Sequence, residues 1–224
     1  MDTRADRILQ YVKGPYILDI GCAGHVAEPN SPYWVHEQLR QNFSHVIGID
    51  INEKEIEKLR SLGYDGLHAA SAETFTLPHK FDTIVAGELI EHLSNPGLFL
   101  ERAKKHLTEG GRLVLTTPYP FSLLYTLYAL FKFPKTCQNP EHTCWFCPRT
   151  IGELSRRSGF RIVKWNLIED YRFDDPSPRY RFFVKLILLF GFLIPKRLRC
   201  NTMLFILERD ADHPCSQPLP TARQ

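Results

Sequence analysis

Short apolar runs alternate with amphipathic stretches along the first half of the chain. Such runs are typical of strands that are buried on both faces of a sheet. The apolar runs begin at Ile17, Val46, Phe81 and Leu113. Between them, apolar residues recur at intervals of three and four positions, which predicts helices over residues 6–12, 33–41, 53–62 and 96–107. This alternation predicts an α/β fold with a doubly wound, mostly parallel sheet.

Residues at the ends of two predicted helices support these boundaries. Asn52 stands where an N-cap is expected, and Gly63 follows the same helix at its end. Asn95 and Pro96 begin the next helix. Its apolar face is expected to consist of Leu98, Phe99, Ala103 and Leu107.

The regular alternation ends after about residue 118. Residues 121–133 are apolar and aromatic, a helix is predicted from Cys147 to about Ser158, and residues 161–169 alternate like a strand. Residues 180–194 are apolar again, and residues 201–207 predict a final strand. The polar tail, residues 210–224, contains three prolines and is expected to be disordered.

The composition is that of an ordinary globular protein. The chain has 224 residues, of which 43% are apolar and 24% charged, with a net charge of +3. One domain is therefore expected over residues 1–209. The charged N-terminus is unlike a signal peptide, and no apolar run reaches the roughly 18 to 20 residues that span a bilayer. With six cysteines expected to be free thiols, these features predict a cytoplasmic protein.

The most specific local pattern is a glycine turn that is followed, one strand later, by an acid. The first apolar run leads into Asp19-Ile20-Gly21-Cys22-Ala23-Gly24, and the second ends in Asp50. Glycine lets the backbone approach a ligand that a Cβ atom would block. An acid at the end of the next strand can accept both hydroxyls of a ribose. The pair predicts a cofactor that contains adenosine.

Four motifs in this order resemble the class I S-adenosylmethionine-dependent methyltransferases. The first is Asp19-x-Gly21-x-x-Gly24, in which the second glycine of the family pattern is displaced. The other motifs are Ala72-Glu73, the strand from Phe81 that leads to Glu91-His92, and the Gly110-Gly111 entry into the run that ends at Pro118. The likeness covers roughly residues 16–118 and continues more weakly to about residue 208.

The resemblance implies a Rossmann-like sheet that a final antiparallel hairpin closes. It places the cofactor half at about residues 1–118 and acceptor-binding helical insertions at about residues 119–200. The cofactor is then S-adenosyl-L-methionine. The implied cofactor-binding residues are Asp19, Gly21, Cys22, Gly24, Asp50, Ile51, Ala72, Glu73 and Gly87.

Each of these positions also has a purely structural interpretation. Asp50 is expected to bind the ribose, but an acid can simply open a turn. Asp19 is expected to hold the glycine loop, and Gly21 and Gly24 to provide backbone clearance, although turn glycines are common. Glu73 is either beside the adenine or at the surface.

Two residues are expected to take part in catalysis. Glu88 follows the fourth strand, where the methyl end of the cofactor should lie. His142 belongs to a segment, residues 140–150, that resembles the lead-in of methyltransferases related to the ubiquinone-pathway O-methyltransferases, in which a histidine faces the active site. His142 is therefore the acid/base candidate, against a structural histidine, while His92 is expected to cap or pack.

The same segment leaves a metal open as an alternative. Cys137, His142, Cys144 and Cys147 could form a tetrahedral zinc site, but a second paired knuckle is missing. The preferred interpretation assigns no metal ligand.

Residues 180–194 are apolar and are flanked by basic residues without any acid up to Arg199. They are either a buried helix or a lid that meets an apolar or anionic, lipid-linked acceptor, with peripheral contact to a membrane. Lys185 argues against a span.

These features together predict a methyltransferase that acts on a small molecule, a glycan or a lipid-linked acceptor, with oxygen as the first choice of acceptor atom. The alternative is a binding module that retains the fold without catalysis. Nucleic acid is not the expected partner, because Ala86-Gly87-Glu88-Leu89 stands where DNA and RNA methyltransferases have an Asn/Asp-Pro-Pro-Tyr/Phe tetrad.

Overall fold

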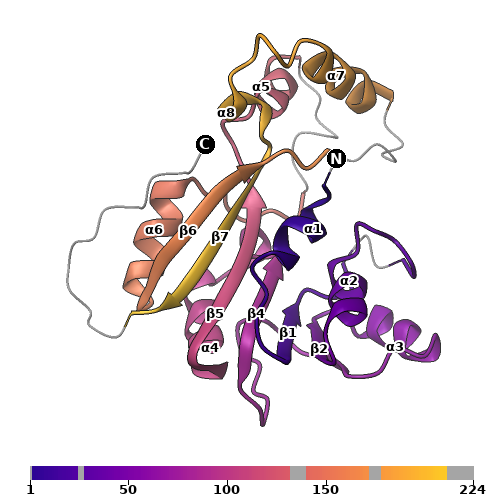
Figure 1. The fold of residues 1–224 in the computed structure, drawn as a ribbon, viewed down its shortest axis with the longest axis vertical. Helices are drawn as coiled ribbons and strands as arrows, with labels where there is room; N and C mark the ends of the chain where they lie inside the picture. The colour runs from indigo at the N-terminus through magenta and orange to yellow at the C-terminus, as the bar shows by residue number, and fades with distance from the viewer. Residues whose placement is uncertain (1, 25–27, 132–139, 172–177, 211–224) are drawn as a thin grey trace.

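A single twisted sheet forms the centre of the protein, with helices on both faces (Figure 1). The computed structural model describes residues 2–24, 28–131, 140–171 and 178–210, and the expected tail from residue 211 onward lies outside them. The strands are β1 (Tyr16–Ile20), β2 (His45–Asp50), β3 (Leu67–Ala69), β4 (Phe81–Gly87), β5 (Leu107–Pro118), β6 (Phe160–Ile168) and β7 (Thr202–Arg209).

The strand order is β3-β2-β1-β4-β5-β7-β6. Strands β1 to β5 pair in parallel, and β7 lies antiparallel between β5 and β6. For example, Val114 of β5 pairs with Ile206 of β7. This arrangement confirms the predicted doubly wound, mostly parallel sheet with a final antiparallel hairpin.

Helices connect the strands and cover the sheet (Figure 1). They are α1 (Arg4–Leu9), α2 (Val35–Asn42), α3 (Glu53–Ser61), the 3₁₀-helix η1 (Ile90–His92), α4 (Pro96–His106), α5 (Leu123–Leu130), α6 (Pro148–Arg157), α7 (Pro178–Leu189) and α8 (Lys196–Arg199).

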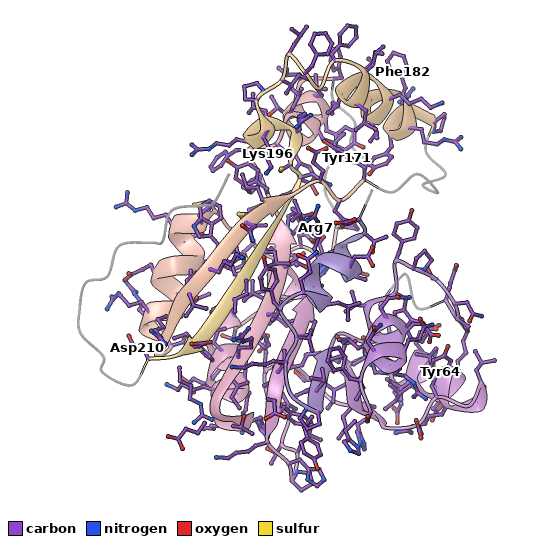
Figure 2. The ribbon with its side chains drawn as sticks, viewed as in Figure 1. Arg7, Tyr64, Tyr171, Phe182, Lys196 and Asp210 are labelled. Atoms are coloured by element: carbon purple, nitrogen blue, oxygen red, sulfur yellow. The ribbon has the colours of Figure 1, made fainter. Side chains whose placement is uncertain are left out.

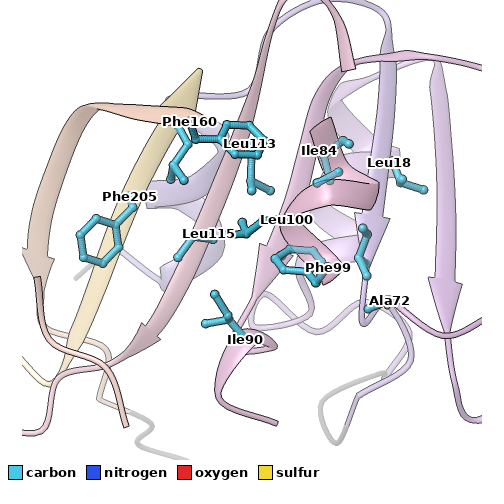
Figure 3. Close-up of a cluster of buried hydrophobic side chains, with 14 of the residues drawn as sticks. Leu18, Ala72, Ile84, Ile90, Phe99, Leu100, Leu113, Leu115, Phe160 and Phe205 are labelled. Atoms are coloured by element: carbon cyan, nitrogen blue, oxygen red, sulfur yellow. The ribbon is translucent and has the colours of Figure 1, made fainter. Parts of the chain in front are cut away.

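The core has two main layers because successive strand residues point to opposite faces. In β1, Leu18 joins the cluster that packs against Phe99 of α4, whereas Ile17 joins the cluster under α1 and α2. Ile84 and Val85 of β4 divide in the same way. Figure 3 shows the first cluster, which extends from Leu18 through Ile84 and Phe99 to Phe205. Burial on both faces explains why these strands are continuous apolar runs.

The expected helix ends are only partly observed. Asn52 caps α3 by accepting from the backbone N–H of Glu55 at 3.3 Å, and Gly63 follows with a φ of +89°. The apolar face predicted for α4 is wrong at two positions. Leu98 is 44% exposed, and Leu107 already begins β5, because the chain turns directly from the helix into the strand.

Helices α5, α7 and α8 gather at the end of the sheet where the parallel strands finish (Figures 1 and 2). A separate apolar cluster holds α5 and α7 together around Leu124, Tyr128 and Val184. The rings of Phe131 and Phe183 stack with their centroids 5.9 Å apart. These helices are the insertions that were expected near the C-terminal end. Within the described ranges, no helix is both long and apolar enough to cross a membrane.

Candidate functional site

The turn after β1 has the backbone geometry that the glycine pattern predicted. Gly21 has a φ of +85°, which side chains other than glycine rarely adopt. A Cβ atom added there would lie 3.3 Å from the Leu89 side chain. At Gly24, by contrast, the nearest atom to an added Cβ is the Gly21 carbonyl oxygen at 3.8 Å. Among the described residues beyond its chain neighbours, this oxygen is the only atom within 4 Å of such a Cβ.

Asp50 lies at the carboxyl end of β2 and connects to this turn. Its Oδ2 accepts from the backbone N–H of Ala23 at 2.9 Å, and its Oδ1 accepts from that of Asn52 at 2.9 Å. Each carboxylate oxygen retains a further lone pair. The next residue, Ile51, is 78% exposed although it is apolar. An acid with remaining acceptor capacity beside an exposed apolar side chain suits a ribose that carries a flat base.

Asp19 and Cys22 point into the protein. The Asp19 carboxylate lies 3.1 Å from Nδ1 of His36 in α2, and both side chains are buried. Asp19 was expected to hold the glycine loop, but the partner that the structure gives its carboxylate is this helix residue. The Cys22 thiol is also buried, and burial together with Asp19 and Asp50 raises its pKa far above the ordinary value.

Two residues that support the turn were not anticipated from the sequence. The Trp34 indole N–H donates to the Cys22 carbonyl oxygen at 2.7 Å. His36, two residues later, is the partner of Asp19. A buried tryptophan needs an acceptor for its N–H, so Trp34 carried a signal, but no local pattern identifies the carbonyl that accepts it.

The loop after β3 lies next to Asp50, because the Ala70 N–H donates to the Asp50 carbonyl oxygen at 2.8 Å. Ala72 is buried in the main core cluster. Glu73 accepts from the backbone N–H of Asn95 at 2.9 Å and from its side-chain amide at 3.2 Å. Both carboxylate oxygens of Glu73 therefore connect this loop to the start of α4.

The end of β4 is conformationally unusual. Glu88 has a φ of +55°, and its backbone N–H donates to the Thr116 carbonyl oxygen at 3.0 Å. Positive φ at a residue other than glycine or asparagine costs energy and is frequent at functional sites. A Cβ on the preceding Gly87 would meet protein atoms only at 3.7 Å or more. The strain at this strand end thus falls on Glu88.

Several charged side chains meet beside Glu88. Arg4 of α1 lies 3.5 Å from the Glu88 carboxylate and 3.7 Å from that of Asp170. Burial raises the pKa of Glu88 to about 7, against the opposing effect of Arg4. Burial and the neighbouring Glu88 raise the pKa of Glu91 to about 8. This end of the sheet therefore holds two carboxyl groups that can carry a proton near neutral pH.

His142 is brought to the same end of the sheet. Its ring makes an edge contact with His92, at a centroid distance of 4.6 Å, and another with Trp145 at 5.5 Å. Burial, together with His92, lowers the pKa of His142, and its Nδ1 is buried without a hydrogen-bond partner. His92 thus takes part in this cluster, with Nδ1 lying 4.0 Å from the Glu141 carboxylate.

Of the cysteines that were considered for zinc, Cys144 and Cys147 do not gather around His142. The Cys144 thiol lies 3.9 Å from the Glu91 carbonyl oxygen, and the Cys147 thiol lies near the Thr150 hydroxyl. Cys137 lies outside the described residues. In the part of the chain that the structure describes, no group of three possible ligands includes Cys144 or Cys147.

Comparisons with known proteins bear on this site. Residues 2–164 match the family described as "Methyltransferase domain". A ubiquinone biosynthesis O-methyltransferase of Aromatoleum aromaticum is 26% identical over 164 residues, which cover 67% of this chain and 66% of that protein. The enzyme of the same name from Hydrogenovibrio crunogenus is 25% identical, with 74% and 73% covered. This chain spans slightly less than two thirds of the Aromatoleum relative's length.

Solved structures agree in fold. A SAM-dependent methyltransferase from Archaeoglobus fulgidus matches with a TM-score of 0.63 at 21% identity, covering 91% of this chain and 90% of that one. A glycopeptide N-methyltransferase in complex with S-adenosyl-L-homocysteine matches with a TM-score of 0.59 at 11% identity, covering 91% and 84%. Because the family match extends over more than half of the chain, the protein belongs to the methyltransferase domain family and, by its fold and motifs, to the class I S-adenosylmethionine-dependent methyltransferases.

Proposed function

We propose that this protein transfers a methyl group from S-adenosyl-L-methionine to a hydroxyl oxygen of a small molecule. The observation that carries the proposal is the pairing of the Gly21 turn, with its positive φ, with Asp50 at the adjoining strand end. Relatives whose names state O-methylation support oxygen as the acceptor atom.

The residues around this turn suit the cofactor. Asp50 would accept the ribose hydroxyls, Ile51 would cover one face of the adenine, and Gly21, Gly24 and Gly87 would let the methionine part approach the backbone. Asp19 would act through His36 and the turn, Cys22 through its backbone, and Ala72 and Glu73 through the loop beside Asp50. When bound, the cofactor supplies an electrophilic methyl group on a sulfonium.

Glu88 is the proposed proton acceptor on the acceptor side. In the reaction, the acceptor oxygen bonds to the methyl carbon while the carbon–sulfur bond breaks and leaves its electron pair on sulfur. The hydroxyl proton passes to a base. Burial keeps the pKa of Glu88 near 7, and its Oε1 is buried without a hydrogen-bond partner. His142, whose pKa burial lowers, is the second candidate for this role.

The reaction is tested with purified full-length protein, labelled S-adenosylmethionine and a panel of hydroxylated small molecules, including phenols and catechols. We expect S-adenosylhomocysteine to form only when an acceptor is present, and we expect Glu88→Gln to lower kcat by about a hundredfold. Cofactor affinity should stay within about twofold of the parent, because Glu88 acts on the acceptor side.

Binding of S-adenosylmethionine without turnover on any acceptor would favour the non-catalytic binding module. Failure to bind the cofactor would overturn both interpretations.

Helix α7 and the turn that follows it form an apolar tip. Its exposed apolar side chains are Phe182, Leu188, Leu189, Phe190, Phe192 and Leu193. Among the apolar side chains of residues 180–194, only Val184 and Ile187 are buried. The alternative that this segment is a buried helix is therefore wrong. The basic residues Arg181, Lys185, Lys196 and Arg197 belong to the same part of the chain and are exposed. Figure 2 labels Phe182 on α7 and Lys196 on α8. We propose that the tip contacts an anionic lipid surface or a lipid-linked acceptor.

Phe192→Glu tests the tip, because Phe192 is 82% exposed. We expect about a tenfold to hundredfold loss of affinity for anionic liposomes, since burial of a phenylalanine side chain in lipid is worth roughly 1.5 to 3 kcal/mol. Binding should weaken as salt rises.

Leu62→Glu, at an exposed leucine that follows α3, is the matched control and should bind liposomes as the parent does. Equal loss in both variants, or no binding by the parent at low salt, would contradict the lipid proposal. A melting temperature of Phe192→Glu far below that of the parent would show that Phe192 is packed.

A further inference from the structure

Three potential metal ligands converge beside the end of β4. Potential ligand atoms of Glu91, His92 and His142 all lie within 4.8 Å of one another. Glu91 is 1% exposed, and its Oε1 is buried without a hydrogen-bond partner, as is Nδ1 of His142. A buried carboxylate oxygen without a donor costs free energy unless a proton or a cation occupies the position. We propose that Glu91, His92 and His142 bind one divalent transition-metal ion.

The fold fixes His142 against η1 although the two segments lie far apart in the sequence. The Glu91 carbonyl oxygen accepts from the Thr143 N–H at 2.8 Å, from its hydroxyl at 3.1 Å and from the Cys144 N–H at 3.3 Å. The Thr143 hydroxyl also donates to the Leu93 carbonyl oxygen at 2.6 Å. These bonds hold the residue after His142 directly on the helix that carries the other two ligands.

Outer partners orient the ligands. The Thr117 hydroxyl donates to Oε2 of Glu91 at 3.0 Å, which fixes the carboxylate and leaves Oε1 for the ion. Glu141 lies 4.0 Å from Nδ1 of His92, a position from which a small movement would bring it to hydrogen-bond distance. Metal-binding histidines usually donate their other ring N–H to such a carboxylate. One of the three ligands, Glu91, therefore has an outer hydrogen bond, and a second, His92, has a carboxylate nearby.

The ligand set favours zinc, iron, manganese or cobalt over magnesium and calcium. Two imidazoles and one carboxylate suit transition metals, whereas magnesium and calcium prefer oxygen ligands alone. Ligands that bind a tetrahedral zinc ion at about 2.1 Å lie about 3.4 Å apart. Donors within 4.8 Å of one another can reach this spacing by modest side-chain rotation. Three protein ligands leave at least one position open, as in catalytic zinc sites.

The open position gives the ion a role, which rests on the proposed function. An ion held by η1, which follows β4, would lie near Glu88, the proposed base on the acceptor side. A hydroxyl oxygen bound to it would lose its proton more readily, because a divalent cation stabilises the alkoxide or phenolate. The acceptor class that fits is a hydroxylated small molecule whose oxygen atoms reach the ion.

The site is tested by calorimetric titration of Zn²⁺ into the metal-free full-length protein, with and without S-adenosylhomocysteine. We expect one ion per chain and, in Glu91→Gln and His142→Gln, an affinity at least about tenfold lower. Glu91→Gln preserves the shape of the buried side chain and an acceptor for Thr117. His142 is less buried than Glu91. If Glu91→Gln does not fold, as judged by its melting temperature, the zinc affinity of His142→Gln tests the site.

His79→Gln, at an exposed histidine that is not part of the ligand group, should bind zinc as the parent does. Cys144→Ser should also leave the affinity within about twofold, since its thiol is outside the ligand group. Unchanged zinc affinity in both ligand variants, a loss only in Cys144→Ser, or no binding by the parent of Zn²⁺, Mn²⁺ or Co²⁺ would overturn the site. Zinc binding without methyl transfer would leave the ion site standing and refute its role in the proposed reaction.

Discussion

Asp50→Ala is expected to lower the affinity for S-adenosylhomocysteine by about tenfold to a hundredfold. The change removes the acceptor that we assign to two ribose hydroxyls, and a buried polar group left without a partner costs roughly 1 to 3 kcal/mol. It also removes the acceptors of the Ala23 and Asn52 N–H groups, at 2.9 Å each, so the turn after β1 loses a connection to β2. Calorimetric titration measures the dissociation constant.

Glu57→Ala is the matched control for this substitution. Glu57 is an exposed acid on α3, the helix that follows Asp50, and its removal should leave the dissociation constant within about twofold. Circular dichroism and a melting curve establish that each variant folds. An unchanged affinity in folded Asp50→Ala would contradict the assignment of the ribose to the end of β2.

Arg4→Ala is expected to lower the free energy of unfolding by about 3 kcal/mol. Arg4 is mostly buried between the carboxylates of Glu88 and Asp170, at 3.5 and 3.7 Å. Removing one partner of a buried ion pair leaves an uncompensated charge, which typically costs about 3 to 5 kcal/mol. For a chain of this size, such a loss lowers the melting temperature by roughly 6 to 12 °C. Chemical denaturation measures the free energy directly.

Arg7→Ala, on the same helix, provides the comparison. Its guanidinium lies 3.2 Å from the Asp2 carboxylate, but both side chains are well exposed, so this ion pair should contribute at most about 0.5 kcal/mol. Equal destabilisation by the two substitutions would mean that loss of helix α1 packing, and not the charge cluster at Glu88, accounts for the effect.

The sequence predicted most of the fold because its signals are local. Ile17 and Leu18, or Ile84 and Val85, are apolar neighbours that point into different core layers, and this produces the continuous apolar runs of a doubly covered sheet. The cap of α3 at Asn52 is likewise a contact between residues three positions apart. The order β3-β2-β1-β4-β5-β7-β6 agrees with the family that the motifs indicated.

The site was only partly predictable. The turn at Gly21 and its proximity to Asp50 follow from adjacent parallel strands, whose carboxyl ends meet at one edge of the sheet. The roles of Asp19 and Glu73 did not follow from the sequence. Their partners are His36 on α2 and Asn95 at the start of α4, and no local pattern specifies how these helices dock. The zinc site considered from the sequence was based on the spacing between cysteines. The cluster in the structure, Glu91, His92 and His142, is formed by segments that are far apart in the chain.

The sequence by itself determined the strand–helix alternation, the glycine turn and the acid one strand later, since these depend on periodicity and on residues close in the chain. Only the tertiary structure decided that Glu91 and His92 meet His142, about fifty residues later, and that Arg4 reaches Glu88 and Asp170. It also decided that the apolar stretch after residue 180 exposes most of its large side chains. The physical reason is that burial, ion pairing and ligand convergence depend on how distant segments pack, and hydrophobicity along the chain does not encode which partner each segment finds.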